Sequence, residues 1–372
     1  MPRYYLIAGE ASGDLHASNL VRELKKLNPE SEFRGFGGDR MMAQGTAIAK
    51  HIRDLDFMGF WEVLINLPVI LGQFKECRED ILAWKPDALI LIDYPGFNLR
   101  MAEFAKKNGI PVFYYISPQI WAWKQGRIRK IRRNVNRMFV ILPFEKDFYA
   151  RFGYEVDFVG HPLLDEIKMD DRTGEPGLLP DLHQDEPLIA ILPGSRPQEI
   201  RRMLPVMLRV AGDFRPGYRF VVAGVSKVNP AVYTHMMAGS DVQVVYGNTY
   251  ALLRSADAAV VTSGTATLEA ALLNVPQVVC YRASGLSYLI AKKLVKLKFI
   301  SLVNLILNKK VVTELIQRDM NPKALKHELE EILLDPEKSS AIIRDYEALR
   351  KLLGQQGASA TTAKLIYKAI VK

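Results

Sequence analysis

Two glycine-containing segments in the second half of the chain have residues that suit phosphate binding. The first is Leu192-Pro193-Gly194-Ser195-Arg196, which follows the apolar run 188–192, and the second is Ser263-Gly264-Thr265, which follows the apolar run 258–261. Each junction has the order strand, loop, helix. The first turn of a helix has unpaired N–H groups and a partial positive charge, so such a loop can seat a phosphate. Two seats in one domain predict a diphosphate ligand, and a nucleotide in particular.

In the first junction we expect Ser195 to cap the helix and Pro197 to take an early helical position. Arg196 offers a fork of N–H donors that matches phosphate oxygens. The alternative is a helix cap beside a surface arginine. The buried strand before the loop favours phosphate binding, because that context gives such a motif its meaning.

In the second junction Ser263, Gly264 and Thr265 let the backbone approach a ligand closely. Glu269 follows about one helical turn later, where its carboxylate could accept hydrogen bonds from both hydroxyls of a ribose. The alternative is an ordinary helix start with a solvated Glu269.

An aspartate ends an apolar run in the first half of the chain. Asp93 follows the predicted strand 88–92, and in an open α/β sheet the carboxyl ends of the strands face the ligand crevice. Asp93 is therefore the candidate general base, although an aspartate that caps a turn fits the spacing equally well. The loop 9–14 follows the first strand in the same way. Its glycines do not form GxGxxG, so we expect it to line an acceptor pocket rather than to hold NAD.

Three further sets of residues could bind metal, form a disulfide or lie at a hinge or cleft, and each has a plainer explanation. Asp54 and Asp56 resemble a metal-binding DxD, but carboxylates are favoured ahead of a helix anyway, so we predict no metal. His161 precedes a possible linker, and a packed or hydrogen-bonded histidine is its commoner explanation. Cys77 and Cys280 fit two small buried side chains better than a disulfide or a metal knuckle. No cofactor is predicted.

Short apolar runs that alternate with amphipathic stretches position these residues. Such alternation is typical of parallel sheets covered on both faces. The segment 165–187 has little periodicity and is interpreted as a linker. We therefore predict an α/β protein with two doubly wound, Rossmann-like domains that face a cleft. The predicted strands are 4–8, 88–92, 112–116 and 138–142 in the first half, and 188–192, 220–223, 242–245, 258–261 and 277–280 in the second.

The 372 residues have a net charge of +9 that is unevenly spread. Basic residues run without an acid from Lys124 to Arg137 and border the apolar segment 286–307. Such charge could bind anionic lipid, an acidic substrate or nucleic acid. The alternative is a solvated basic face that binds no partner. We find no nucleic-acid-binding motif. The N-terminus lacks signal-peptide features and the apolar stretch 57–74 is a poor membrane span, so a cytoplasmic protein is expected.

Several blocks together resemble the lipid-A-disaccharide synthase family. The resemblance spans nearly the whole chain, and its most specific blocks are Gly9-Glu10-Ala11-Ser12-Gly13-Asp14 and Pro118-Gln119-Ile120-Trp121-Ala122-Trp123-Lys124. The other blocks are 142–145, 159–162, 192–196 and 263–269. The resemblance implies an inverting glycosyltransferase of GT-B architecture. Such an enzyme joins UDP-2,3-diacylglucosamine to 2,3-diacylglucosamine 1-phosphate (lipid X) through a β-1,6 bond and releases UDP.

The resemblance also implies roles for individual residues. Asp93 matches the proposed base, Glu10 a functional acid and Arg196 a donor-site arginine, while Asn304 matches an active-site asparagine that Glu314 and Gln317 follow. Ser12, Gly13 and Gln119 lie in the two specific blocks and are expected to bind substrate. Val303 stands where proline often precedes the asparagine.

At the scale of domains, the resemblance implies an acceptor-side domain of residues 1–165 and a UDP-sugar domain of residues 166–344. A C-terminal helix, within 345–372, returns to the first domain. Segments 57–74 and 286–307 become candidates for acyl contact and for peripheral docking on the inner face of the cytoplasmic membrane. The oligomeric state stays open.

Overall fold

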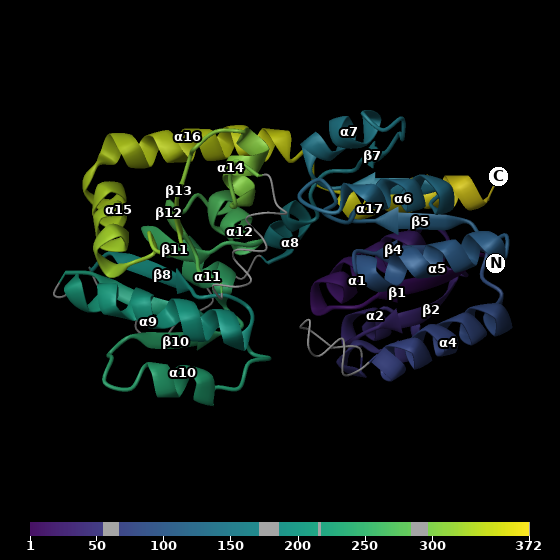
Figure 1. The fold of residues 1–372 in the computed structure, drawn as a ribbon, viewed down its shortest axis with the longest axis horizontal. Helices are drawn as coiled ribbons and strands as arrows, with labels where there is room; N and C mark the ends of the chain where they lie inside the picture. Colours follow the sequence, from purple (N-terminus) through teal and green to yellow (C-terminus); the bar gives the residue numbers. More distant parts are fainter. Residues whose placement is uncertain (55–66, 171–185, 215–216, 284–296, 372) are drawn as a thin grey trace. The chain divides into compact units, whose positions relative to one another are not determined.

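The structure is a computed structural model of the chain, and it describes residues 1–54, 67–170, 186–214, 217–283 and 297–371. The chain divides into two compact units (Figure 1). The first comprises Met1–Asp165 and Leu353–Lys372, and the second comprises Glu166–Leu352.

The first unit contains a seven-stranded sheet in which every pair of neighbours is parallel. Its strands lie in the order β3-β2-β1-β4-β5-β6-β7. The strands are β1 (Arg3–Ala8), β2 (Glu32–Gly37), β3 (Ala47–His51), β4 (Ala88–Ile92), β5 (Val112–Tyr115), β6 (Arg137–Val140) and β7 (Asp157–Phe158).

Helices cover both faces of this sheet because successive strand residues point to opposite faces. Tyr4 and Leu6 pack with α1 (Ala11–Leu27) and α17 (Ala358–Ile370). Tyr5 and Ile7 pack in the opposite core, to which four helices contribute. These are α4 (Leu67–Trp84), α5 (Pro95–Lys107), α6 (Ile128–Asn134) and α7 (Pro143–Ala150). The short elements of the unit are α2 (Asp39–Ala43) and the 3-10 turns η1 (Ile52–Asp54) and η2 (Gln125–Arg127).

The second unit repeats the same topology without a visible repeat in the sequence. Its six parallel strands lie in the order β10-β9-β8-β11-β12-β13. Its first strand is therefore central, the next two extend to one side, and the chain then crosses to the other side, as in the first unit. The strands are β8 (Leu188–Leu192), β9 (Arg219–Gly224), β10 (Gln243–Tyr246), β11 (Ala258–Thr262), β12 (Gln277–Tyr281) and β13 (Thr313–Ile316).

Helices again cover this sheet. Strand residues Leu188, Ala190 and Val261 share a core with α11 (Thr249–Arg254) and α12 (Ala266–Leu272). The helix α8 (Leu163–Met169) crosses the boundary between the two units. The helices wholly within the second unit are α9 (Pro197–Asp213), α10 (Ala231–Met236), α11 (Thr249–Arg254), α12 (Ala266–Leu272), α14 (Leu302–Leu307), α15 (Pro322–Leu334) and α16 (Pro336–Leu352).

The structure corrects three details of the sequence prediction. Residues 165–169 are helical rather than loop, while 171–185 of the predicted linker lie outside the described residues. Residues 345–352 continue α16 in the second unit, and the C-terminal return begins at Leu353. Most of the loop 9–14 is helical, because α1 begins at Ala11.

The segments predicted to contact acyl chains are described only in part, since 55–66 and 284–296 fall outside the described residues. Of the first segment, Phe74 is buried in the core and stacks on Phe97 with ring centroids 4.3 Å apart, whereas Leu71 is 54% exposed. Of the second segment, Val303 and Ile306 are buried in α14. No helix in the described part of the chain is long and apolar enough to cross a membrane.

Candidate functional site

The predicted polar loops lie at the point in each sheet where the strand order reverses. In the first unit the loops after β1 and β4 leave neighbouring strands and run in opposite directions, and in the second unit the loops after β8 and β11 do the same. Ligands of open α/β sheets bind in the crevice that such loops form. Glu10 and Asp93 follow β1 and β4, while Ser195 and Ser263 follow β8 and β11.

Asp93 lies on a backbone turn that neighbouring residues hold in place. Both Asp93 and Tyr94 are left-handed, with φ of 43° and 49°, a conformation that costs energy for side chains other than glycine. The Asp93 carbonyl accepts from Asn98 Nδ2 at 2.7 Å and from the Tyr114 hydroxyl. The Asp93 N–H donates to the Tyr115 carbonyl at 3.2 Å. The backbone of the candidate base is thus fixed while its carboxyl group stays separate from these bonds.

The environment of the Asp93 carboxyl suits a base that works near neutral pH. Burial, and then the negative charge of Glu10, raise the pKa of Asp93 to about 6. A hydrogen bond from the Tyr94 backbone and the nearby His16 act in the opposite direction. A general base is most effective when its pKa lies close to the working pH.

The first loop contributes one acid and a closely packed helix start. Glu10 is the N-cap residue of α1, although its side chain does not cap the helix. Ser12 is exposed, whereas Gly13 is buried against Ala8. A Cβ at Gly9 would collide with the ring of Tyr94, so glycine is what lets the loops after β1 and β4 touch.

Gln119 is exposed on the loop after β5, and a buried glutamate anchors that loop. Glu145, 1% exposed, accepts from the Ser117 hydroxyl at 2.5 Å and from the Leu142 N–H at 2.9 Å. Burial raises the pKa of Glu145 to about 7, against the lowering effect of the Ser117 bond. This anchoring role of Glu145 is not among the predictions from the sequence. The available signal was a glutamate three residues after the N-cap of α7, the position that a capping box uses.

His161 is a packed histidine in this structure. It is 5% exposed, and its Nδ1 accepts from the Leu163 N–H at 3.2 Å. Burial, together with His16, lowers the pKa of His161 to about 3. The ring is therefore neutral at physiological pH.

At the first junction of the second unit, the helix starts one residue later than predicted. Arg196 rather than Ser195 is the N-cap of α9, and Pro197 is the first helical residue. Gly194 has φ of 118°, and a Cβ there would collide with Glu199. Proline fixes the helix start because its ring sets φ and it has no N–H to satisfy.

Glu199 occupies donors that the sequence analysis assigned to phosphate. Its Oε2 accepts from the Ser195 N–H at 3.0 Å and from the Arg196 N–H at 3.3 Å. Its Oε1 lies 3.9 Å from a guanidinium nitrogen of Arg196, whose side chain is 56% exposed. This junction is therefore a self-capped helix start with an arginine free to extend into solvent.

At the second junction, Gly264 and Thr265 are exposed, and nothing lies within 4 Å of a Cβ built on Gly264. Thr265 is the N-cap of α12, a helix of seven residues. The Ser263 hydroxyl donates to the Ile300 carbonyl at 3.0 Å. Ser263 thus ties this loop to the segment that precedes α14, and Gly264 leaves room for a ligand.

Glu269 is partly buried rather than solvated. Its Oε1 accepts from the Tyr250 hydroxyl at 3.3 Å. Burial, and then the charge of Glu166, raise the pKa of Glu269 to about 7, while the Tyr250 bond lowers it.

Asn304 and Glu314 form one buried network. Asn304 is fully buried, donates from Nδ2 to Glu314 Oε1 at 2.9 Å and accepts at Oδ1 from the Val311 N–H at 2.8 Å. The two carboxylate oxygens of Glu314 accept from the N–H groups of Ile300 and Ser301, each at 2.9 Å. Both side chains therefore fix backbone, and through Ile300 they fix the partner of Ser263.

Gln317 plays a similar part at the end of β13. Its Oε1 accepts from the Ala283 N–H at 2.6 Å, and its Nε2 donates to the Ala283 carbonyl at 3.3 Å.

The valine at position 303, where the family often has proline, does not disturb the backbone. Val303 lies in the first turn of α14, where an N–H has no helical acceptor and proline is equally tolerated.

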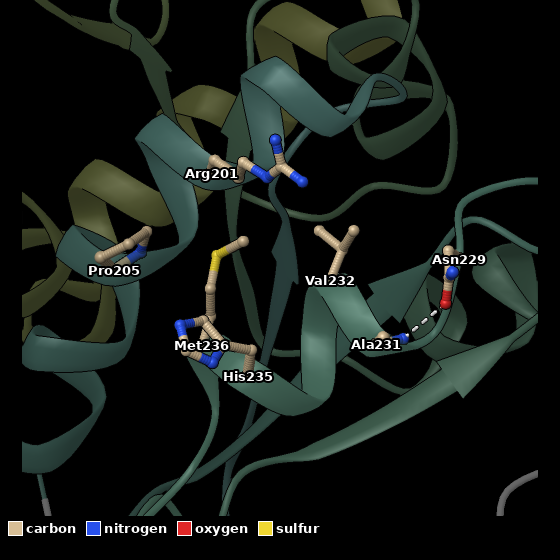
Figure 2. A pocket seen from close by; sticks show the side chains of 7 residues that line it. All are labelled: Arg201, Pro205, Asn229, Ala231, Val232, His235 and Met236. Carbon is tan, nitrogen blue, oxygen red and sulfur yellow. Dashed lines mark hydrogen bonds between the residues drawn. The ribbon is translucent and has the colours of Figure 1, made fainter.

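A cavity of about 590 Å³ lies between α9 and α10. Figure 2 shows the side chains that line it: Arg201, Pro205, Asn229, Ala231, Val232, His235 and Met236. None of these is a predicted site residue.

Asp54 and Asp56 are the two carboxylates for which no metal was predicted. Asp54 is the last residue of η1, and its carbonyl accepts from Gln73 Nε2 at 2.9 Å. Asp56 lies outside the described residues.

Solved structures share this fold over the whole chain. A putative UDP-N-acetylglucosamine 2-epimerase from Listeria monocytogenes matches with a TM-score of 0.67 at 15% identity, covering 99% of this chain and 95% of that one. A glycosyltransferase of kitacinnamycin matches with a TM-score of 0.69 at 15% identity, covering 100% of both chains. The fold is thus that of the GT-B glycosyltransferases and related epimerases. Within that class, the chain belongs to the lipid-A-disaccharide synthetase family, whose model matches residues 4–369.

Named relatives agree with this membership. The chain is 42% identical to lipid-A-disaccharide synthase of Syntrophus aciditrophicus, over 99% of this chain and 97% of that protein. It is 39% identical to the enzyme of the same name from Myxococcus xanthus, over 99% of this chain and 98% of that protein. The expected family and fold class are therefore confirmed.

Proposed function

We propose that this protein joins UDP-2,3-diacylglucosamine to lipid X and forms the β-1,6-linked lipid A disaccharide 1-phosphate and UDP. Membership of the lipid-A-disaccharide synthetase family over residues 4–369 is the observation that carries the proposal. The reaction needs an acceptor hydroxyl, a base to deprotonate it and a site that stabilises departing UDP.

In this proposal Asp93 is the base. The 6-hydroxyl of lipid X attacks the anomeric carbon of the donor sugar and gives its proton to the Asp93 carboxylate, while the bond from that carbon to the UDP oxygen breaks. A single displacement inverts the anomeric centre. Support comes from the raised pKa of Asp93, about 6, and from its position after β4. Glu10 contributes through its charge, and Ser12, Gly13 and Gln119 belong to the loops proposed to bind the acceptor.

The second unit is proposed to hold UDP. Gly194, Ser195 and Arg196 follow β8, and Ser263, Gly264 and Thr265 follow the neighbouring β11, so both loops border one switch point. Arg196 has the reach and charge to stabilise the negative charge of the leaving UDP. In the same scheme Glu269 receives the ribose hydroxyls in place of the Tyr250 hydroxyl.

The network below these loops supports them without itself touching the diphosphate. The polar side-chain atoms of Asn304 and Glu314 bond to each other and to backbone groups. We therefore assign them, together with Gln317, a positioning role in substrate binding. The first unit supplies base and acceptor pocket, and the second supplies the leaving-group site. We further propose that the protein works peripherally at the anionic inner face of the cytoplasmic membrane, where acylated substrates would reside, and that the reaction uses no cofactor.

One assay tests the proposal. The purified protein is incubated with UDP-2,3-diacylglucosamine and lipid X, separately and together, and the products are separated. Disaccharide and UDP in equal amounts, only when both substrates are present, are expected. Conversion of the UDP-sugar without lipid X would instead indicate an epimerase, and no product at all would indicate a non-catalytic lipid- or nucleotide-binding protein. Transfer in a parallel reaction that supplies a muramyl acceptor would indicate a different transferase.

A further inference from the structure

An exposed tryptophan in the first unit lies among basic side chains. Trp123 is 41% exposed, while the neighbouring Trp121 packs edge-on against Phe144 with ring centroids 5.0 Å apart. Lys124 Nζ lies 4.3 Å from the Trp123 ring centroid, and the Arg127 guanidinium lies 5.9 Å from it. The Trp123 indole therefore lies at the surface with two cations against its ring, so an apolar ring and positive charge are presented together.

The helix that follows has one apolar face and one basic face. In α6, Ile128 and Ile131 are buried together with Asn134. The other side chains of the helix are basic and exposed: Arg129, Lys130, Arg132 and Arg133. The buried face packs on the unit, so the charges point away from it.

These cations have no acidic partners in the part of the chain that the structure describes. Elsewhere in the first unit, basic groups are commonly paired, as in Arg137–Asp157 at 2.9 Å and Lys107–Glu103 at 3.1 Å. The charges of Lys130 and Arg133 help to lower the pKa of Glu103, after the larger effect of Lys107, without forming an ion pair with it. A cluster of like charges left unpaired costs electrostatic self-repulsion, which an anionic partner removes.

We propose that this α6 basic surface docks on an anionic lipid bilayer. The surface comprises Trp123, Lys124, Arg127, Arg129, Lys130, Arg132 and Arg133. The choice of a bilayer rests on the proposed function, because acylated substrates reside in one. Indole rings favour the membrane–water interface, and basic side chains beside it bind anionic headgroups. The loop that carries Trp123 begins after β5, at the same edge of the sheet as Asp93, so docking here brings the candidate acceptor site to the lipid.

Vesicle sedimentation of the full chain tests the charge component. Binding to phosphatidylglycerol vesicles is expected, weakening as salt rises, with little binding to pure phosphatidylcholine. The double variant Arg129→Gln with Arg132→Gln should weaken partitioning roughly 30-fold, since each basic residue near the surface contributes about fivefold. The matched control, Lys364→Gln with Lys368→Gln, removes two exposed charges from α17 of the same unit and should change binding less than threefold. Equal losses in both variants would overturn the assignment of this surface.

Tryptophan quenching tests the contact itself. Brominated lipid in the phosphatidylglycerol vesicles should quench the wild-type fluorescence, and Trp123→Phe should reduce that quenching while thermal unfolding stays unchanged. Unaltered quenching in Trp123→Phe would contradict the proposal. So would tight binding of a single-stranded oligonucleotide with none to vesicles, which would indicate a nucleic-acid surface.

These outcomes are independent of the proposed reaction. Turnover with detergent-dispersed substrates should be the same in the wild type and in the Arg129→Gln, Arg132→Gln variant. Failure of the reaction would appear as absence of disaccharide with vesicle binding intact, and failure of the docking surface would appear as normal turnover with unchanged vesicle binding in the variant.

Discussion

At the scale of single residues, acid–base chemistry depends on where the chain buries a carboxyl group. Asp93, Glu145 and Glu269 have pKa values raised to about 6, 7 and 7, and burial is the largest cause for each. Their second influences differ: Asp93 lies near the charge of Glu10, Glu145 is bonded to Ser117, and Glu269 lies near Glu166. Of the three, Asp93 combines this shift with a position directly after a strand, at the point where the strand order of its sheet reverses.

The pH profile of turnover should report Asp93. The base must be ionised, so kcat/KM should rise with pH through about 6 and fall about tenfold per pH unit below it. Glu10→Gln removes a negative charge that raises the pKa of Asp93, so the acid limb should move to lower pH. The limb should stay above the ordinary aspartate range, because burial remains. An acid limb unmoved in Glu10→Gln would show that the two carboxyls do not interact.

The stability of the protein should report Glu145. Its folded-state pKa, about 7, lies above the unfolded value near 4.5, so the folded state binds the extra proton between these values. The stabilisation from that proton is complete below about pH 4.5 and is lost as pH rises through about 7. Urea titrations should therefore show the wild type losing stability over this window relative to Glu145→Gln, in which the amide cannot ionise. Parallel pH dependences in the two proteins would contradict this.

At the scale of elements, the candidate site consists of loops that neighbouring strands bring together. Polar side chains beneath these loops hold their backbone in place. Gly9 admits the ring of Tyr94 between two loops, and Glu145 anchors the loop that presents Gln119. In the second unit Glu314 and Gln317, both on or beside β13, fasten Ile300 and Ala283. The loops proposed to bind substrate are thus held by side chains that are buried or partly buried.

The helix start at Arg196 makes a prediction for UDP affinity. Arg196→Ala should weaken UDP binding by about 1.5 to 3 kcal/mol, the usual range for a hydrogen bond to a charged group. Glu199→Gln should tighten binding, because the carboxylate beside Arg196 competes with phosphate for its charge while an amide oxygen can still cap Ser195. Calorimetric titration with UDP measures both. Unchanged affinity in Arg196→Ala would remove this junction from the donor site.

How far the sequence predicts these elements depends on how apolar they are. Runs 88–92 and 188–192 match β4 and β8, since both strands are buried throughout. The prediction missed β2 because its apolar run is interrupted. Arg34, in the middle of this strand, pairs with Asp80 at 2.7 Å, and position 35 is a glycine with no apolar side chain. It also missed β13, an edge strand of four residues.

Candidate site residues follow the same division. The positions of Asp93 and Arg196 could be predicted because each follows an apolar strand. The contacts of Asn304 could not, since only the folded chain brings its partners, the Val311 N–H and the Glu314 carboxylate, near it. The cap by Glu199 had a signal that was missed, a glutamate three residues after the N-cap. The pattern at Ser195 predicted a cap, but Glu199 caps the helix from inside its first turn.

At the scale of the whole molecule, the chain builds one topology twice and gives each copy different chemistry. Both units have a central first strand, and both place polar loops after the first and fourth strands. The C-terminal segment joins the first unit, where α17 packs on α1. The first unit carries the candidate base, and the second carries Arg196 and the glycine-containing loops. The two units are therefore expected to divide the proposed reaction between them.

The most direct test of this claim measures Asp93→Asn in two ways on one protein preparation. Turnover of UDP-2,3-diacylglucosamine with lipid X should fall roughly 10²- to 10⁴-fold, the usual contribution of a general base. UDP affinity by calorimetry should stay within about twofold of the wild type, because UDP is assigned to the other unit. A tenfold change would correspond to about 1.4 kcal/mol of binding free energy, so calorimetry separates the two outcomes. Near-normal turnover, or a loss of UDP binding that parallels the loss of turnover, would contradict the account.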